Sequence, residues 1–302
     1  MNLLNQLSKS EKLAKGGKLN RFINKPYKYF RAHYINKISY PINQKSKLVK
    51  TPIFTNDIMH LLIPAGLDIY LTGIKSHCSE IRLCKYFIQN LKKGNTFIDI
   101  GAHFGFYSLL AAKLVGASGK VFSFEAAKSI YSVLSKNINN KPNVHPFNNA
   151  ISNQKGNINF YEFPIQYSEY NSIDIEQYKK FNWFKKQIPT LSIIESTNLD
   201  NFTTQQNCAP QFIKIDVEGA EKLVIEGAVN CIKNHQPIIA MEFLLDQRGN
   251  QNHIEAAQTI LKSNYTINKI ADNGNLIPTT LIELLNSATK SAQSDNLIFA
   301  PI

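Results

Sequence analysis

Four short apolar runs, each ending in a carboxylate, constrain the fold of this chain more than any other feature. The runs occupy residues 97–99, 121–125, 212–218 and 238–242. Stretches with helical periodicity separate them, and this alternation is typical of buried parallel strands in an α/β sheet. Because the carboxyl ends of parallel strands meet at one edge, where such sheets bind their ligands, we expect the acids to gather there.

The predicted row of acids favours a ligand that carries positive charge and free hydroxyl groups. Its members are Asp99, Glu125, Asp216, Glu218 and Glu242. S-adenosylmethionine meets both requirements, because it combines a sulfonium, an ammonium and a ribose. The sequence therefore indicates an enzyme that uses this cofactor.

The positive charge of the chain is concentrated in its first 50 residues. They contain twelve Lys or Arg and the single acid Glu11, whereas the rest of the 302-residue chain has 22 basic and 21 acidic residues. We therefore predict a basic extension over residues 1–50 and a cofactor-binding domain over residues 51–302, which is large enough for a substantial core. Aromatic residues among the basic ones would let the extension bind anionic lipid or an acidic polymer. The alternative is a partly ordered solubilising or packing extension.

The cysteines and the apolar runs of the sequence indicate the cellular compartment in which the protein is expected. The four cysteines, Cys78, Cys84, Cys208 and Cys231, form no CxxC pair and no zinc spacing, so we expect reduced thiols. The first residues lack the apolar core of a secretory signal, and no run approaches the roughly 18 apolar residues of a membrane span. We expect a cytoplasmic protein whose contact with the inner membrane surface, if any, is peripheral.

The order of the predicted elements indicates a single α/β sheet. From residue 96 the pattern reads βαβαβ, which requires a parallel sheet with right-handed crossovers. The segment at residues 165–187 is rich in Tyr, Lys and Asn and longer than most connections, which is typical of a lid or binding loop. The predicted strands are 58–64 and 67–72 (as a hairpin around Ala65-Gly66), 121–124, 144–147, 157–163, 189–194, 212–217, 237–243, 266–270 and 296–300, and the predicted helices are 79–91, 106–115, 128–137, 220–232 and 252–261.

A glycine turn follows the strand that begins at residue 96. Gly101 permits a tight turn, and Gly105 lets the next helix pack closely on the sheet or on a ligand. The spacing is G-x-x-x-G rather than the G-x-G-x-x-G that cradles a pyrophosphate, which disfavours NAD. His103, within the turn, could touch the cofactor or substrate, although a His at a helix start is more often a polar surface group.

Glu125 ends the next strand, 24 residues after Gly101. That offset is close to the roughly 20 residues at which an acid binds ribose hydroxyls in nucleotide-binding βαβ units. The third strand ends in Asn148 and Asn149, followed by Ala150, and these amides could hydrogen-bond a purine edge.

Asp216, Glu218 and Glu221 lie where a later strand turns into a helix. Alternation along the strand directs Asp216 and Glu218 to the same side, and Glu242 ends the neighbouring strand. Carboxylates gathered in this way repel one another, so one can have a raised pKa and act as a general base, or the group can hold a hard divalent cation. Glu221 has a structural alternative, because an acid in the first turn stabilises a helix dipole.

Together these motifs resemble the FkbM-type S-adenosylmethionine-dependent methyltransferases. The resemblance is carried by residues 97–108, 121–126, 149–152, 212–221 and 237–243. It implies a class I methyltransferase fold: an α/β, Rossmann-like, mostly parallel seven-stranded sheet with helices on both faces and an antiparallel last strand. The basic extension and residues 165–187 fall outside the family pattern.

The resemblance also implies the roles of individual residues. The turn from Gly101 to Gly105 would surround the methionine moiety, Glu125 would bind the ribose, and Asp216 would face the reacting end. His103 stands where the family usually has Asn, and Ala126 replaces a frequent Pro, but neither change removes a required charge. The full set of implied cofactor-binding residues is Asp99, Gly101, Ala102, His103, Gly105, Glu125, Ala126, Asn149 and Ala150, the last two beside the adenine, and Asp216.

We therefore expect methylation of a hydroxyl of a sugar, glycoconjugate precursor or small molecule, the hydroxyl preference being what the resemblance implies. Asp216 or Glu218 would accept the hydroxyl proton, with Glu242 completing the catalytic group. A divalent ion held by these three acids ranks second, so no metal is assigned. The alternatives are an RNA methyltransferase and a non-catalytic cofactor-binding scaffold recruited by the basic extension. No nucleic-acid partner is expected, because the sequence has no RRM, KH or dsRBD signature.

Overall fold

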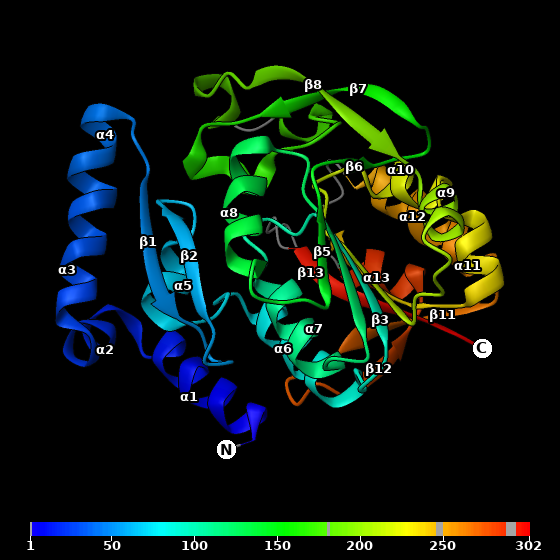
Figure 1. Ribbon diagram of the computed structural model, residues 1–302, viewed down its shortest axis with the longest axis horizontal. Helices are drawn as coiled ribbons and strands as arrows, with labels where there is room; N and C mark the ends of the chain where they lie inside the picture. The colour runs from blue at the N-terminus through cyan, green and yellow to red at the C-terminus, as the bar shows by residue number, and fades with distance from the viewer. Residues whose placement is uncertain (1, 180–181, 246–249, 288–293) are drawn as a thin grey trace.

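A twisted eight-stranded sheet forms the centre of the molecule (Figure 1). The structure is a computed structural model, and it describes residues 2–179, 182–245, 250–287 and 294–302. The strand order is β12-β11-β13-β10-β9-β3-β4-β5. The strands are β3 (Thr96–Ile100), β4 (Lys120–Phe124), β5 (Val144–Phe147), β9 (Phe212–Ile215), β10 (Ile238–Leu244), β11 (Tyr265–Ile270), β12 (Leu276–Thr279) and β13 (Ser294–Pro301).

The pairing confirms the predicted fold class. Strands β5, β4, β3, β9 and β10 are parallel, and β13 runs antiparallel between β10 and β11. The sheet has one strand more than predicted, because β12 pairs with β11 as an antiparallel hairpin. This edge strand is short and largely exposed, so it lacks the apolar run by which the other strands are recognised.

The central strands are buried on both faces, which is why they read as continuous apolar runs. Alternate residues enter different cores: Phe97 packs into one hydrophobic cluster, and Ile98 and Ile100 pack into the other. One core is covered by α6 (Cys78–Asn90), α7 (Phe106–Val115) and α8 (Lys128–Ile138). The other is covered by α9 (Leu199–Gln205), α10 (Glu221–Glu226), α11 (Val229–His235), α12 (Gln251–Leu261) and α13 (Leu281–Ser287).

The predicted helix at residues 220–232 is wrong as a single element, because the chain forms α10 and α11 with a break between them. Gly227 lies at the break, and a Cβ atom there would lie 2.1 Å from the carbonyl oxygen of Ser152. The break therefore accommodates the close approach of another segment of backbone, which helical periodicity does not reveal.

Residues 3–43 form helices that pack against the sheet domain. They are α1 (Leu3–Lys15), α2 (Gly17–Asn24), α3 (Pro26–Tyr34), the π-helical turn η1 (Ile35–Ser39) and α4 (Tyr40–Asn43). Leu7 of α1 is fully buried, and Lys85 Nζ of α6 lies 2.9 Å from Glu11 Oε2. The basic extension is therefore ordered and docked, and its predicted boundary at residue 50 falls within strand β1 (Lys47–Pro52).

The predicted hairpin of residues 58–64 and 67–72 is wrong. Strand β2 (Ile58–Ile63) pairs antiparallel with β1, and residues 67–72 form helix α5 (Leu67–Thr72). A short apolar run fits a strand and a buried helix equally well. Here the helix is favoured locally, because Asp68 accepts hydrogen bonds from the Ile69 and Ser76 backbone N–H groups and Gly73 ends the helix at a positive φ of 82°.

The predicted strands at residues 157–163 and 189–194 are confirmed, but they build a separate sheet. Strands β6 (Ala150–Ile151), β8 (Thr190–Thr197) and β7 (Gly156–Glu162) pair in this order at the top of Figure 1. The segment between β7 and β8 forms the 3-10 turns η2 (Ile165–Tyr170), η3 (Glu176–Tyr178) and η4 (Phe184–Lys186).

Two further expectations are tested directly. All four cysteines are unpaired, as predicted. Within the described parts of the chain, no helix combines the length and the apolar character that crossing a bilayer requires.

Candidate functional site

A cavity of about 780 Å³ lies at the carboxyl ends of β3, β4, β9 and β10. Segments from three parts of the chain line it: the N-terminal region, the sheet, and the segment between β7 and β8. Of the predicted site residues, nine line the cavity, namely Gly101, His103, Glu125, Ala126, Asn149, Ala150, Asp216, Glu218 and Glu242. The remaining three, Asp99, Ala102 and Gly105, are not among its lining residues, so their direct contact with a ligand stays a prediction.

The glycine turn brings backbone into close contact with the end of β9. Gly101 has a φ of +75°, and a Cβ atom built on it would lie 1.8 Å from the carbonyl oxygen of Asp216. Gly105 has a φ of +86°, and its Cβ atom would lie 2.6 Å from Leu134 Cδ1 of α8. Conformation favours glycine at both positions, and at Gly101 the contact with backbone also leaves no space for a side chain.

Replacing Gly101 by alanine is expected to lower the free energy of unfolding by at least about 2 kcal/mol, because the methyl group would displace the Asp216 backbone. Gly17→Ala is the matched control. Gly17 has a similar φ of +71°, but a Cβ atom added there would meet nothing within 4 Å, so this variant reports conformational strain alone. Urea denaturation of both variants measures the difference. An equal loss in the two would contradict the predicted clash.

Glu125 is held rigidly at the end of β4. Its Oε2 accepts a hydrogen bond from the His103 N–H at 2.9 Å, and its Oε1 accepts one from the Ala127 N–H at 2.9 Å. The Asn148 side chain donates to the carbonyl oxygens of Glu125 and Ala126. Burial raises the pKa of Glu125 to about 7. Each carboxylate oxygen can accept a second hydrogen bond, as a pair of ribose hydroxyls would require.

The side chains of Asn148 and Asn149, which follow β5, make different contacts. Asn148 supports the Glu125 turn, as its hydrogen bonds show. The Asn149 side chain donates to Glu195 Oε2 of β8 at 3.2 Å, so it joins the cavity wall to the three-stranded sheet. Contact of Asn149 and Ala150 with an adenine stays a prediction.

The three predicted catalytic acids lie together. One carboxylate oxygen each of Asp216, Glu218 and Glu242 lies within 4.8 Å of the others, a spacing that could hold a metal ion. Burial and the neighbouring Glu242 and Asp216 carboxylates raise the pKa of Glu218 well above its usual range. Burial and the Asp216 carboxylate do the same for the pKa of Glu242. The cluster therefore holds protons that its members would lose in water.

Asp216 differs from the other two acids because ammonium groups lie beside it. Lys214 Nζ is 3.0 Å from Asp216 Oδ2, and Lys75 Nζ is 3.6 Å from the same oxygen. Burial alone would raise the pKa of Asp216, but these two cations outweigh it and hold the pKa well below its usual range. Asp216 is thus a permanent anion at the cavity, whereas Glu218 keeps its proton to a higher pH than an ordinary glutamate does.

Several site residues were not predicted from the sequence. Lys75 lines the cavity and lies 2.9 Å from Glu80 Oε2, which also accepts a hydrogen bond from the Tyr107 hydroxyl. Burial alone would lower the pKa of Lys75, but Glu80 and Asp216 raise it well above its usual range. The sequence could have identified Lys214 as a site residue, because a lysine inside a buried apolar strand requires a charged partner. The sequence contains no such indication for Lys75 and Glu80, because they precede the sheet by some twenty residues and reach it only through tertiary packing.

Asp99 and Glu221 are buried beside the cavity without lining it, and they hold neighbouring site residues in position. Asp99 is fully buried, accepts a hydrogen bond from Ser108 Oγ at 2.6 Å and lies 3.7 Å from Lys214 Nζ. Glu221 is also fully buried and accepts hydrogen bonds from the Val217 and Gly219 N–H groups. These bonds hold the turn that carries Glu218, whose φ is +55°. For Glu221 the structure therefore supports the structural alternative.

The segment between β7 and β8 covers the cavity with aromatic rings. The Trp183 ring stacks on those of Tyr167 and Tyr170, with centroids 5.1 and 4.9 Å apart. Tyr178 donates a hydrogen bond of 2.6 Å to Glu218 Oε2. Tyr170, Tyr178 and Trp183 all line the cavity. The segment thus forms part of the cavity wall, and its role as a lid or binding loop stays a prediction.

His103 lies inside the covered site rather than on the surface. Its Nε2 is 3.0 Å from Ser168 Oγ of the covering segment. Burial lowers the pKa of His103 to about 3, so the ring is neutral at physiological pH. A neutral ring at this position can contact a ligand without opposing the positive charge of a sulfonium.

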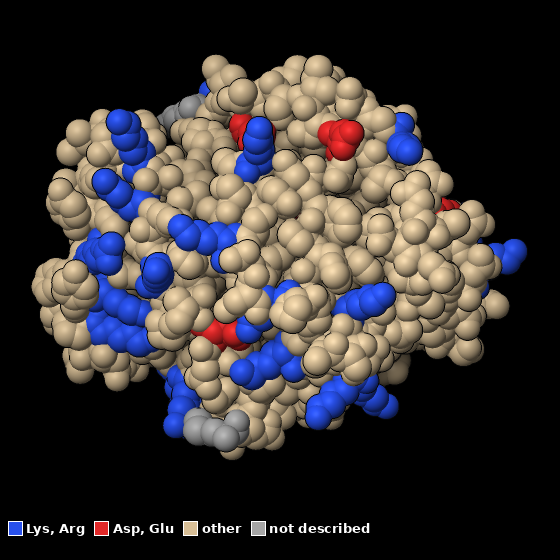
Figure 2. Space-filling model, in the orientation of Figure 1, with Lys and Arg blue, Asp and Glu red and all other residues tan. Residues whose placement is uncertain are grey.

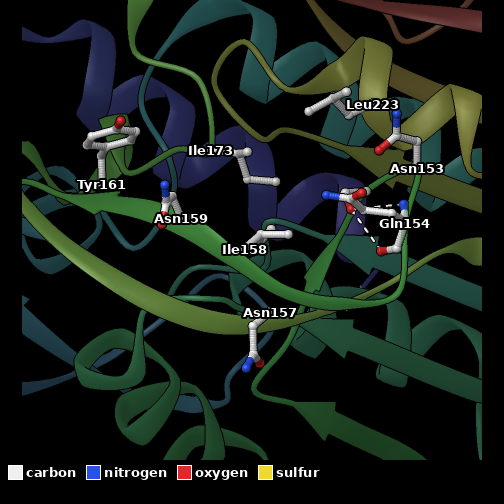
Figure 3. A pocket seen from close by; sticks show the side chains of 9 residues that line it. Asn153, Gln154, Asn157, Ile158, Asn159, Tyr161, Ile173 and Leu223 are labelled. Carbon is white, nitrogen blue, oxygen red and sulfur yellow. Dashed lines mark hydrogen bonds between the residues drawn. The ribbon is translucent and has the colours of Figure 1, made fainter.

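A second hollow of about 430 Å³ lies beside β7 (Figure 3). Asn159, Ile158 and Tyr161 border it on one side and Leu223 on the other, and Ser152 is hydrogen-bonded to the main chain of Gln154. It is polar and open, and it contains none of the predicted site residues. We therefore assign the chemistry to the larger cavity.

Comparisons with known proteins identify the family of this chain. The profile described as "Methyltransferase FkbM domain" matches residues 99–267, more than half of the chain. No curated protein matches the sequence. Among solved structures, a methyltransferase FkbM from Methylobacillus flagellatus is similar over 78% of this chain and 52% of its own length, with 16% identity and a TM-score of 0.46. This chain therefore spans about half the length of that protein.

Two further structures are similar at lower identity. A putative rRNA-methylase from Clostridium thermocellum aligns over 76% of this chain and 100% of its own, with 12% identity and a TM-score of 0.43. Aeropyrum pernix fibrillarin, in complex with S-adenosylmethionine, aligns over 72% and 74%, with 9% identity and a TM-score of 0.41. All three TM-scores are below 0.5.

Proposed function

Because this chain belongs to the FkbM methyltransferase family, whose members use S-adenosylmethionine, we propose that it methylates a hydroxyl group of a sugar, a glycoconjugate precursor or another small molecule. The observation that carries this proposal is the acid cluster: Glu218, with its raised pKa, and Glu242 lie at the cavity beside the permanently ionised Asp216. A hydroxyl is a poor nucleophile until its proton is removed, and this cluster provides a group that can remove it.

The proposed division of labour follows from the positions of the side chains. Glu125 accepts the ribose hydroxyls of the cofactor, and Asp216 places a negative charge where the cationic end of the cofactor belongs. S-adenosylmethionine supplies an electrophilic methyl group. The acceptor oxygen forms a bond to that methyl group as the carbon–sulfur bond breaks, and the hydroxyl proton moves to Glu218. The protein contributes chiefly by holding the two reactants in line.

Glu218 is the better candidate for the base than Asp216. A general base works best when its pKa lies near the operating pH. The pKa of Asp216 is held low by Lys214 and Lys75, which makes it a weak base, whereas the pKa of Glu218 is raised. Tyr178, hydrogen-bonded to Glu218 Oε2, fixes the orientation of the carboxyl group.

A divalent cation at the acid cluster is the second candidate mechanism. Three carboxylate oxygens within 4.8 Å are ligands of the kind that Mg²⁺ and Ca²⁺ prefer. The cation would lower the pKa of a bound hydroxyl directly. Against it, the ammonium groups of Lys75 and Lys214 lie 3.6 and 3.0 Å from Asp216 Oδ2, where they would repel a divalent cation.

The aromatic rings over the cavity support a sugar as the acceptor. Trp183, Tyr170 and Tyr178 offer flat apolar faces, and Gln166 and Asn171 add amides beside them. An apolar pocket with a few convergent polar groups is the usual design of a small-molecule site. A ring with one apolar face and hydroxyls at its edge fits such a surface.

Replacing Trp183 by alanine is expected to raise the KM for the acceptor by about tenfold or more, because the ring loses a stacking face. The dissociation constant for S-adenosylhomocysteine should not change. Phe184→Ala is the matched control, since Phe184 belongs to the same aromatic cluster but does not line the cavity. If both variants raised KM equally, the effect would come from the fold of the segment rather than from contact with the acceptor.

The proposed function is tested by calorimetric titration with S-adenosylhomocysteine and NADH, followed by methyl transfer from labelled S-adenosylmethionine to a panel of sugars, nucleotide sugars and RNA. We expect micromolar binding of S-adenosylhomocysteine alone and label in a sugar hydroxyl. Label in RNA would support the RNA alternative. Binding without transfer to any acceptor would favour a cofactor-binding scaffold.

A further inference from the structure

The N-terminal helices carry a row of large apolar side chains that face away from the protein. Its members, the apolar stripe, are Leu19, Ile23, Tyr27, Phe30, Tyr34, Ile38 and Ile42, with exposed fractions between 48% and 79%. Leu19 and Ile23 are one turn apart on α2, and Tyr27, Phe30, Tyr34, Ile38 and Ile42 recur every three or four residues along α3, η1 and α4, as residues on one side of a helix do. Monomeric proteins seldom expose so many neighbouring apolar residues, which instead mark an interaction surface.

The packing of these helices explains why the stripe faces outward. Elements α3, η1 and α4 follow one another without a gap over residues 26–43, a run of roughly 27 Å at 1.5 Å per residue. Ala32, Ile35 and Tyr40 occupy the inner side of this run and are buried. The larger apolar residues therefore lie opposite the core, on the run of α3 and α4 that forms the left edge of the molecule in Figure 1.

The charge around the stripe has one sign. Residues 12–50 contain eleven Lys or Arg and no Asp or Glu. Lys18, Arg31, Lys37 and Lys45 are exposed close to the stripe in sequence. Figure 2 shows Lys and Arg gathered over the N-terminal helices at the left of the molecule. A partner for this surface must therefore be both apolar and negatively charged.

We propose that the apolar stripe and its basic neighbours form a docking surface for an anionic lipid bilayer. Amphipathic helices of this kind lie in the membrane interface, with apolar side chains among the acyl chains and Lys or Arg at the headgroups. A second copy of this chain fits less well, because two surfaces without any acid over residues 12–50 repel each other. RNA also fits less well, since Leu19, Ile23, Ile38 and Ile42 offer neither stacking faces nor hydrogen bonds.

The docking surface lies next to the cavity. Arg21 of α2 lines the cavity and donates a hydrogen bond to the Ala14 carbonyl oxygen, and its Nε has no hydrogen-bond partner among the described residues. Docking through α2 would therefore hold the cavity close to the bilayer. This surface goes beyond the proposed function, because lipid binding and cofactor binding can succeed or fail independently.

The test is flotation of the full chain with vesicles of phosphatidylcholine alone or with 30% phosphatidylglycerol. We expect binding to the anionic vesicles only, weakened by 0.5 M salt. The double variant Ile23→Asn/Ile42→Asn should lower the partition coefficient at least about tenfold. Its matched control is Ile193→Asn/Ile282→Asn, because both residues are 72% exposed but lie elsewhere.

A charge variant separates the two contributions. Arg31→Glu/Lys37→Glu should also lower partitioning at least about tenfold, whereas Lys155→Glu/Lys233→Glu, at exposed sites outside the docking surface, should not. Calorimetry with S-adenosylhomocysteine is run on every variant, so a failure to dock is distinguished from a failure of the cofactor site.

Three results would overturn the proposal. The first is the absence of binding to anionic vesicles. The second is a concentration-dependent dimer, detected by light scattering, that the Ile23→Asn/Ile42→Asn variant abolishes, because the stripe would then join two copies. The third is RNA binding that the charge variant abolishes but the isoleucine variant does not, without vesicle binding.

Discussion

Replacing Glu125 by alanine is expected to weaken binding of S-adenosylhomocysteine at least about 100-fold. Both carboxylate oxygens of Glu125 are already oriented by backbone N–H groups, and each has capacity for one more hydrogen bond. Two hydrogen bonds from ribose hydroxyls to a charged acceptor contribute about 3 kcal/mol or more together. Isothermal calorimetry at pH 8 measures the loss.

Two controls protect this prediction against a folding artefact. Alanine leaves the His103 and Ala127 N–H groups without an acceptor, so the unfolding transition of each variant is measured alongside. Glu125→Gln keeps the shape and one acceptor oxygen, and we expect an intermediate loss. Glu226→Ala, at a partly exposed site in α10, should bind normally. If a folded Glu125→Ala protein bound S-adenosylhomocysteine with unchanged affinity, Glu125 would not be the ribose-binding residue.

The raised pKa of Glu125 predicts how binding and stability depend on pH. The ionised carboxylate is the better acceptor, so affinity should rise as the pH increases through about 7. Stability changes in the opposite direction. Between the unfolded pKa of 4.5 and the folded value of about 7, the native state holds a proton that the unfolded state has lost, so stability falls as pH rises across this window. Glu125→Gln should flatten this part of the stability profile.

Replacing Glu218 by glutamine is expected to lower kcat by about 10² to 10⁴, the usual contribution of a general base. Binding of S-adenosylhomocysteine should be nearly unchanged, because Glu218 acts on the acceptor rather than on the cofactor. In the parent enzyme the rate should rise with pH as Glu218 loses its proton, from a pKa above the usual range of a glutamate. The variant should lack this rising limb.

The matched control for Glu218 is Glu176→Gln, an exposed acid in the covering segment that does not line the cavity. A chelator separates the two mechanisms for the acid cluster. If EDTA abolished activity and Mg²⁺ restored it, the cluster would act as a metal site rather than as a proton acceptor. Full activity of Glu218→Gln without a pH shift would rule out Glu218 as the base.

The sequence by itself determined the parallel part of the sheet and the placement of its acids. Strands β3, β4, β9 and β10 are short and largely buried on both faces, so their apolar runs are local signals that no tertiary contact overrides. The sequence also predicted Gly101 and Glu125 as site residues, because a glycine turn and an acid at the end of a strand can each be recognised from a few consecutive residues. The parallel topology placed Asp216 and Glu242 at one edge of the sheet. Glu218 joins them through the turn after β9, where its φ is +55°, and not through the predicted alternation along a strand.

Only the tertiary structure decided the chemistry of that cluster. Lys75 reaches Asp216 from a segment that precedes the sheet, and Tyr178 reaches Glu218 from the covering segment. Residues 220–235 form two helices, because the backbone of Ser152 packs against Gly227 at the break between them. The pKa values differ for the same reason: a carboxylate's charge depends on burial and on cations that sequence neighbours do not supply, so Asp216 and Glu218, two residues apart, are shifted in opposite directions.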